Sequence, residues 1–175
     1  MKMLKFIVSL LGLIIVMTLV LVSCKREESF PVVPSISMVE FKGYGSDSAI
    51  CRINFTDGDG DIGLDPFDTV APYNRTSKYF YDMFLVYYYD TLGVWKPFNQ
   101  HPADTAHSKF DTLQYTYRIP NLTQNGQAKA LQGEIKVKIP APYAIPGQTY
   151  KYTVLLVDRA LHHSNIVETP PQKAP

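Results

Sequence analysis

Apolar and polar side chains alternate along much of the chain. In residues 49–55 every second position is apolar or small, while Arg52 and Asn54 point the other way. Residues 131–139 repeat the pattern. A period of two residues is typical of a β-strand with one buried face. The pattern therefore predicts two half-buried strands, and it predicts that Cys51 is a small core residue and not a reactive thiol.

Shorter or denser apolar runs predict six further strands, at about residues 36–41, 80–89, 94–98, 113–119, 150–156 and 165–168. The second of these is apolar on both sides, which is typical of a central strand that is covered on both faces. No segment shows the period of an amphipathic helix, and 13 prolines and 10 glycines separate the runs. We therefore expect an all-β fold, an antiparallel β-sandwich of about seven or eight strands. The domain would span residues 35–169, with residues 170–175 as a C-terminal tail.

The chain opens with an apolar run over residues 6–22, which follows Lys2 and Lys5. The run is almost long enough to cross a bilayer, but it stops at Cys24 and a highly polar stretch follows, as after a cleaved export signal. The alternative is a signal anchor that stays in the membrane. No basic cluster follows the run to stop transfer, so we favour cleavage and export.

Residues 21–24, Leu-Val-Ser-Cys, resemble a bacterial lipobox. The resemblance implies a signal peptide of residues 1–23 and a tether of residues 24–34 that begins with a lipidated Cys24. Several acyl chains per anchor hold a protein on a membrane durably, because each buried methylene adds about 0.8 kcal/mol. We therefore expect a covalent lipid on Cys24 and attachment to a membrane.

Removal of the signal peptide changes the charge balance of the chain. The 17 basic residues less Lys2 and Lys5 leave 15, against 16 acidic residues, in a mature chain of 152 residues. A net charge of −1 without a basic tract does not favour a nucleic-acid partner. With Cys24 lipidated, Cys51 is alone, so we expect no internal disulfide.

Two further segments resemble bacterial envelope proteins. Residues 152–160, Tyr-Thr-Val-Leu-Leu-Val-Asp-Arg-Ala, are similar to the penultimate strand and following turn of bacterial immunoglobulin-like domains. Residues 55–63, Phe-Thr-Asp-Gly-Asp-Gly-Asp-Ile-Gly, resemble a short sequence motif that recurs in uncharacterised Bacteroidota outer-membrane lipoproteins. The polar residues 25–28, which follow Cys24, resemble the signals found after the lipidated cysteine of surface-displayed lipoproteins in this group. The resemblance implies an immunoglobulin-like sandwich that is lipid-anchored in the outer membrane at the cell surface, with the periplasmic face as the alternative.

The acidic segment Asp57-Gly58-Asp59-Gly60-Asp61 is the clearest indication of a binding site in the sequence. Ca²⁺ takes six to eight oxygen ligands, and alternating Asp and Gly lets several carboxylates turn toward one point. An ordinary turn is the alternative, because Asp and Gly are also preferred turn residues. We expect a structural calcium site. Its candidate ligands are Asp57, Asp59, Asp61, Asp65 and Asp158, with Ser164 or Asn165 as further oxygen donors if the loop after residue 157 lies at the same end of the sandwich.

No catalytic motif for a nucleophile, a zinc site or a phosphate loop is present in the sequence. We therefore expect a non-catalytic binding or accessory subunit that docks on another envelope protein. Tyr73, Tyr79 and Tyr143 fall near predicted loops and are candidates for a partner surface, because tyrosine is common at interfaces. The first two could instead stack on sugar rings, so a glycan-binding module for nutrient capture is one alternative. A hydrolase is the other, and it requires a deep pocket with perturbed titratable groups.

Overall fold

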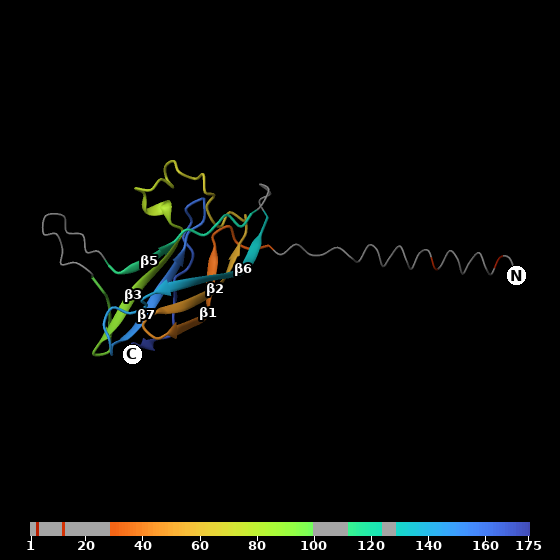
Figure 1. The fold of residues 1–175 in the computed structure, drawn as a ribbon. Coiled ribbons are helices and arrows are strands. Elements are labelled where there is room, and N and C mark those ends of the chain that lie inside the picture. The colour runs from red at the N-terminus through yellow and green to blue at the C-terminus, as the bar shows by residue number, and fades with distance from the viewer. Residues whose placement is uncertain (1–2, 4–11, 13–28, 100–111, 124–128) are drawn as a thin grey trace.

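The computed structural model describes residues 3, 12, 29–99, 112–123 and 129–175. The predicted lipidation site, Cys24, lies outside this described part. No helix in the described part of the chain has both the length and the apolar character needed to span a bilayer. Within it the protein is an all-β sandwich of two antiparallel sheets, which confirms the predicted fold class (Figure 1).

The first sheet contains three long strands in the order β1-β2-β6. Their bounds are Ser35–Tyr44 for β1, Ser48–Asp57 for β2 and Leu131–Pro140 for β6. Both pairings are antiparallel, and a bulge between Met38 and Glu40 interrupts the register of β1. These are the segments in which alternation was clearest, because one face of the sheet packs on the core and the other faces solvent.

The second sheet is built on two central strands, β3 (Met83–Thr91) and β7 (Thr149–Leu156). Two short strands, β4 (Val94–Pro97) and β5 (Gln114–Tyr117), share the outer edge of β3. Two others, β8 (Val167–Glu168) and β9 (Gln172–Lys173), share the outer edge of β7. A single 3₁₀ turn, η1 (Lys78–Phe80), precedes β3 in the described part.

The core lies between the sheets and is rich in aromatic rings. Ala49, Cys51 and Ile53 are fully buried, as the alternation of residues 49–55 predicts. Burial raises the pKa of the Cys51 thiol to about 12, so this cysteine is an inert core residue. Tyr87 and Tyr152 are also fully buried, with ring centroids 5.5 Å apart in an edge-to-face contact. Much of the tyrosine content of the chain therefore serves packing.

Three details of the predicted organisation are wrong. The outward residues of β3, such as Val86, are only half-buried, because no further layer covers the second sheet in the described part of the chain. The segment 170–175 is not a tail: β9 pairs with β7, and Ala174 is buried. The domain also starts before residue 35, because Pro34 is fully buried. Short strands beside prolines carry too little pattern to reveal such pairing.

Side chains from the second sheet and from the loop between β7 and β8 protect the outer edges of the first sheet. The Asn165 side chain accepts a hydrogen bond from the Ile36 N–H at 2.8 Å and donates one to the Ile36 carbonyl at 2.8 Å. It thus pairs with β1 as a neighbouring strand would. At the other edge, the Tyr117 hydroxyl donates to the Lys138 carbonyl of β6 at 2.8 Å. These contacts occupy backbone groups that an open sheet edge would leave unpaired.

Replacement of Asn165 by Ala is expected to destabilise the fold by about 1–2 kcal/mol, because two hydrogen bonds to Ile36 are lost at a partly buried site. Urea unfolding at pH 7 measures the change. Asn165→Asp serves as the matched variant: it keeps the acceptor and loses the donor, so its loss should be intermediate. Equal stability of all three proteins would show that the hydrogen bonds between Asn165 and Ile36 contribute nothing to the stability of the fold.

Candidate metal centre

The acidic loop begins where β2 ends, at the end of the sandwich where β3 starts and β7 finishes. Asp57 is the last residue of β2, and the chain then turns sharply at Gly60, whose φ is 71°. A Cβ at Gly60 would lie 1.9 Å from the Lys129 carbonyl oxygen, and a Cβ at Gly58 would lie 2.3 Å from the Phe30 carbonyl oxygen. Both glycines are therefore required by close backbone approach. They allow the three aspartates to turn to one side.

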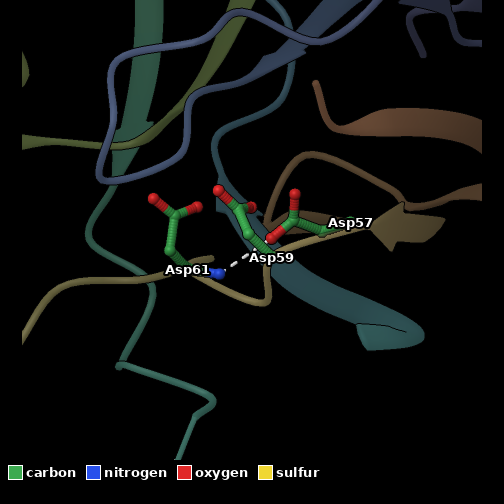
Figure 2. A group of neighbouring side chains, drawn as sticks. All are labelled: Asp57, Asp59 and Asp61. Carbon is green, nitrogen blue, oxygen red and sulfur yellow. Dashed lines mark hydrogen bonds between the residues drawn. The ribbon is translucent and has the colours of Figure 1, made fainter. Parts of the chain in front are cut away.

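The three aspartates of this loop converge (Figure 2). One carboxylate oxygen from each of Asp57, Asp59 and Asp61 lies within 4.8 Å of those of the other two. The Asp57 side chain is completely buried, and its Oδ2 accepts a hydrogen bond from the Asp61 N–H at 2.8 Å. The Oδ1 atoms of all three residues are shielded from solvent and have no hydrogen-bond partner among the described residues. The sequence prediction that these carboxylates meet is confirmed.

Proximity and burial disfavour the charged forms of these groups. Burial raises the pKa of Asp57 to about 6, and the negative charges of Asp59 and Asp61 act in the same direction. Burial also raises the pKa of Asp61, together with the charge of Asp158. At neutral pH the loop thus holds charges that repel one another, and no described residue donates a hydrogen bond to the three buried Oδ1 atoms.

This arrangement fits a calcium ion. Two oxygens bound to one Ca²⁺ at about 2.3–2.6 Å lie no more than about 5 Å apart, which agrees with the separation of the aspartate oxygens. A cation would supply the missing partner of each Oδ1 atom and offset the repulsion. Asp57, Asp59 and Asp61 are the residues that would hold it.

The loop that follows β7 reaches the acidic loop, as expected for two loops at one end of the sandwich. The Arg159 N–H donates to the Asp61 carbonyl at 3.2 Å, and the Ala160 N–H donates to Asp61 Oδ2 at 2.9 Å. Asp158, however, uses both carboxylate oxygens for His162, at 2.7 Å to the backbone N–H and 2.9 Å to Nδ1. This bond raises the pKa of His162. Asp158 therefore stabilises its own turn and is not part of the three-aspartate cluster, although its charge acts on Asp57 and Asp61.

The two further donors expected from this loop are engaged elsewhere. Ser164 Oγ accepts from the Leu156 N–H at 3.0 Å and donates to the Asn165 carbonyl at 2.7 Å. The Asn165 amide is committed to Ile36 of β1. The prediction that Ser164 or Asn165 completes the metal site is therefore wrong in this structure, because both side chains join strands.

Asp65 also lies apart from the cluster. Its Oδ2 accepts hydrogen bonds from Arg159 at 2.9 Å and from Asn121 at 3.1 Å. The Arg159 guanidinium also reaches Asp68, and its hydrogen bond to Asp65 lowers the pKa of that carboxyl. Sequence reasoning missed Arg159, although it directly follows the aspartate that ends the alternating run of β7.

A second arginine, Arg118, fixes the same loop from another side. Its guanidinium donates to the backbone carbonyls of Asp65 at 2.8 Å, Asp68 at 3.0 Å and Phe80 at 2.7 Å. It also lies 4.9 Å from the centre of the Phe80 ring. The long connection between the acidic loop and β3 is therefore tied down at both of its ends. No sequence motif signals this role, because it depends on carbonyls that are distant in sequence.

The three tyrosines predicted to form a partner surface are all half-buried. The Tyr73 hydroxyl donates to the Arg159 carbonyl. The Tyr79 ring packs edge-on against His163, with centroids 6.2 Å apart. The Tyr143 ring lies 6.2 Å from that of Tyr150. Each is used in packing, so this structure does not favour Tyr73 and Tyr79 as a stacking platform for sugars.

Asp82 is a buried acid that sequence reasoning missed. It is 3% exposed, and its Oδ1 accepts from the Ile119 N–H at 2.7 Å, whereas Oδ2 is buried and has no hydrogen-bond partner in the part of the chain that the structure describes. Burial raises its pKa to about 7. The cleft that it lines with Tyr79 and Leu161 leaves no space for even a water-sized molecule. Ligand pockets start at about 300 Å³, so this cleft does not favour a hydrolase site.

Stability should fall as the pH rises through the titration of Asp82. Its pKa is about 7 in the folded protein against 3.8 for the free group, so folding favours the protonated form. The favourable contribution is complete below pH 3.8 and is lost as the pH approaches 7. Relative to Asp82→Asn, the native protein should lose about 2 kcal/mol between pH 5 and pH 8 in urea unfolding with EGTA. Parallel pH profiles for the two proteins would contradict this prediction.

Comparison with known proteins gives no assignment: no family model matches the chain, and no curated protein matches it. The acidic loop and the N-terminal segment are therefore the features of this chain that bear on its function.

Proposed function

We propose that this chain is a non-catalytic lipoprotein of the bacterial outer membrane, anchored through Cys24, whose β-sandwich binds a structural Ca²⁺ and acts as a binding or accessory subunit of an envelope complex. The observation that carries the proposal is the cluster of Asp57, Asp59 and Asp61, whose carboxylate oxygens lie within 4.8 Å of one another, with a buried Oδ1 on each residue that has no hydrogen-bond partner in the described part of the chain. A domain without a disulfide in the described part gains stability from such an ion, because binding to the folded state alone stabilises it.

The sandwich is proposed to be immunoglobulin-like. In that fold the first, second, fifth and fourth strands of the constant-type set form one sheet, and the third, sixth and seventh form the other. The order β1-β2-β6 opposite β4-β3-β7-β8 supports this assignment, with β4 as the additional strand beside β3. The loop after β2 and the loop after β7 lie at the same end in such a fold, as Asp61 and Arg159 do here.

Native mass spectrometry tests the whole proposal. The mature protein would be extracted from outer membranes in mild detergent, through a tag at the C-terminus, and analysed with and without prior EGTA treatment. The expected result is a chain that begins at a lipidated Cys24, carries Ca²⁺, and is bound to a stoichiometric envelope protein. A chain that retains residues 1–23, or that is recovered without metal and without a partner, would contradict the proposal.

A further inference from the structure

The long connection between the acidic loop and β3 exposes an apolar tip. Phe67 is 91% exposed and Val70 is 74% exposed. Single exposed apolar residues are common on protein surfaces, but these two occupy one loop that Arg118 and Arg159 tie to the body of the domain. The tip is therefore held outward from the end of the sandwich that carries the aspartate cluster. In Figure 1 this is the yellow loop.

The tether leads to the same end of the domain. The Phe30 carbonyl packs so closely on Gly58 that a Cβ there would lie 2.3 Å away. Phe30 is the sixth residue after Cys24. A fully extended chain spans at most about 3.5 Å per residue, so the lipidated residue lies within about 20 Å of Phe30. Membrane anchoring through Cys24 therefore brings the cluster end close to the lipid surface.

The charges of the loop suit a lipid headgroup surface. Arg75 and Lys78 are exposed and lie a few residues beyond the apolar tip. The two acids of the loop, Asp65 and Asp68, are paired with Arg159 and so do not oppose the approach of phosphate groups. Aromatic and aliphatic side chains flanked by basic residues are the usual composition of protein segments that rest in a membrane interface.

We propose that the Phe67–Val70 tip rests on the lipid headgroup surface of the membrane that holds the anchor. The inference depends on the proposed lipidation of Cys24. It orients the domain, because the opposite end then points away from the membrane. That end carries the exposed side chains of Tyr44, Leu92 and Val94, which become available to a protein partner.

Fluorescence quenching in vesicles tests this orientation. The full mature lipoprotein would carry Thr69→Cys, labelled with an environment-sensitive fluorophore, in vesicles of phosphatidylcholine and phosphatidylglycerol. Thr69 lies between the two apolar residues and is exposed. Cys24 is blocked by lipid and Cys51 is buried, so the new thiol is labelled selectively. Val94→Cys is the matched control at the far end.

Doxyl-labelled lipid should quench the probe at position 69 and not the probe at position 94. Iodide in solution should quench the probe at position 69 about threefold less than the probe at position 94. Adding Phe67→Ser and Val70→Ser should restore iodide access. Equal iodide quenching at both positions would overturn the inference. So would protection from iodide without doxyl quenching, because protein would then cover the tip. Flotation of the vesicles reports the anchor separately: a protein that does not float has lost the proposed anchor, and the inference falls with it.

Discussion

Calcium is expected to raise the melting temperature of the metal-free protein by about 10 °C. At a concentration about 1,000-fold above the dissociation constant, a ligand of the folded state adds about 4 kcal/mol of stability. For a domain of this size, each kcal/mol shifts the melting temperature by about 2–4 °C. The physical source is the set of three buried aspartate oxygens that have no partner among the residues the structure describes.

Thermal unfolding followed by circular dichroism measures this shift, with EGTA-treated protein as the reference. Mg²⁺ is the control ion. It is smaller, requires near-octahedral geometry and sheds its water reluctantly, so its effect should be clearly weaker. An identical melting temperature with EGTA, Mg²⁺ and Ca²⁺ would mean that the aspartates form an ordinary turn.

Asp57→Asn is expected to change the stability of the fold in opposite directions in EGTA and in saturating Ca²⁺. In EGTA at pH 7.5 the variant should be more stable than the native protein by about 2 kcal/mol. The reason is that the pKa of Asp57 is about 6 against 3.8 for the free group, so ionisation opposes folding between these values and the full cost is present above pH 6. Asparagine removes that charge and can still accept the hydrogen bond from the Asp61 N–H.

In saturating Ca²⁺ the native protein should be more stable than the variant, because the variant lacks one of the three carboxylates and gains little stability from the ion. Urea unfolding of both proteins in each condition gives the four free energies required. Asp47→Asn, at an exposed turn at the other end of the sandwich, is the matched control and should behave as the native protein in both. A variant that is less stable than the native protein in EGTA would show that burial of the Asp57 charge has no cost.

Alternation was sufficient to predict the long strands, because one face of each is buried and the other is polar. Residues 49–55 and 131–139 illustrate this. The same rule failed at β9, where two residues after a pair of prolines join the sheet through backbone pairing alone. It also failed at β3, where apolar side chains on both faces suggested a covering layer that the described part of the chain does not provide.

The candidate site was predictable to the extent that it is local. Asp57, Asp59 and Asp61 converge because the glycines between them impose a tight turn. Asp65, Asp158, Ser164 and Asn165 were chosen for their chemistry and position, but each has a partner distant in sequence or within its own turn. Such pairings depend on tertiary structure, and residue type does not reveal them.

Isothermal titration of the metal-free protein with CaCl₂ is the most direct test of the calcium site. We predict saturable binding of one Ca²⁺ per chain, and no saturable heat for Asp57→Asn under the same conditions. A folded native protein that shows no saturable binding up to about 10 mM Ca²⁺, well above the range of extracellular calcium modules, would contradict the account.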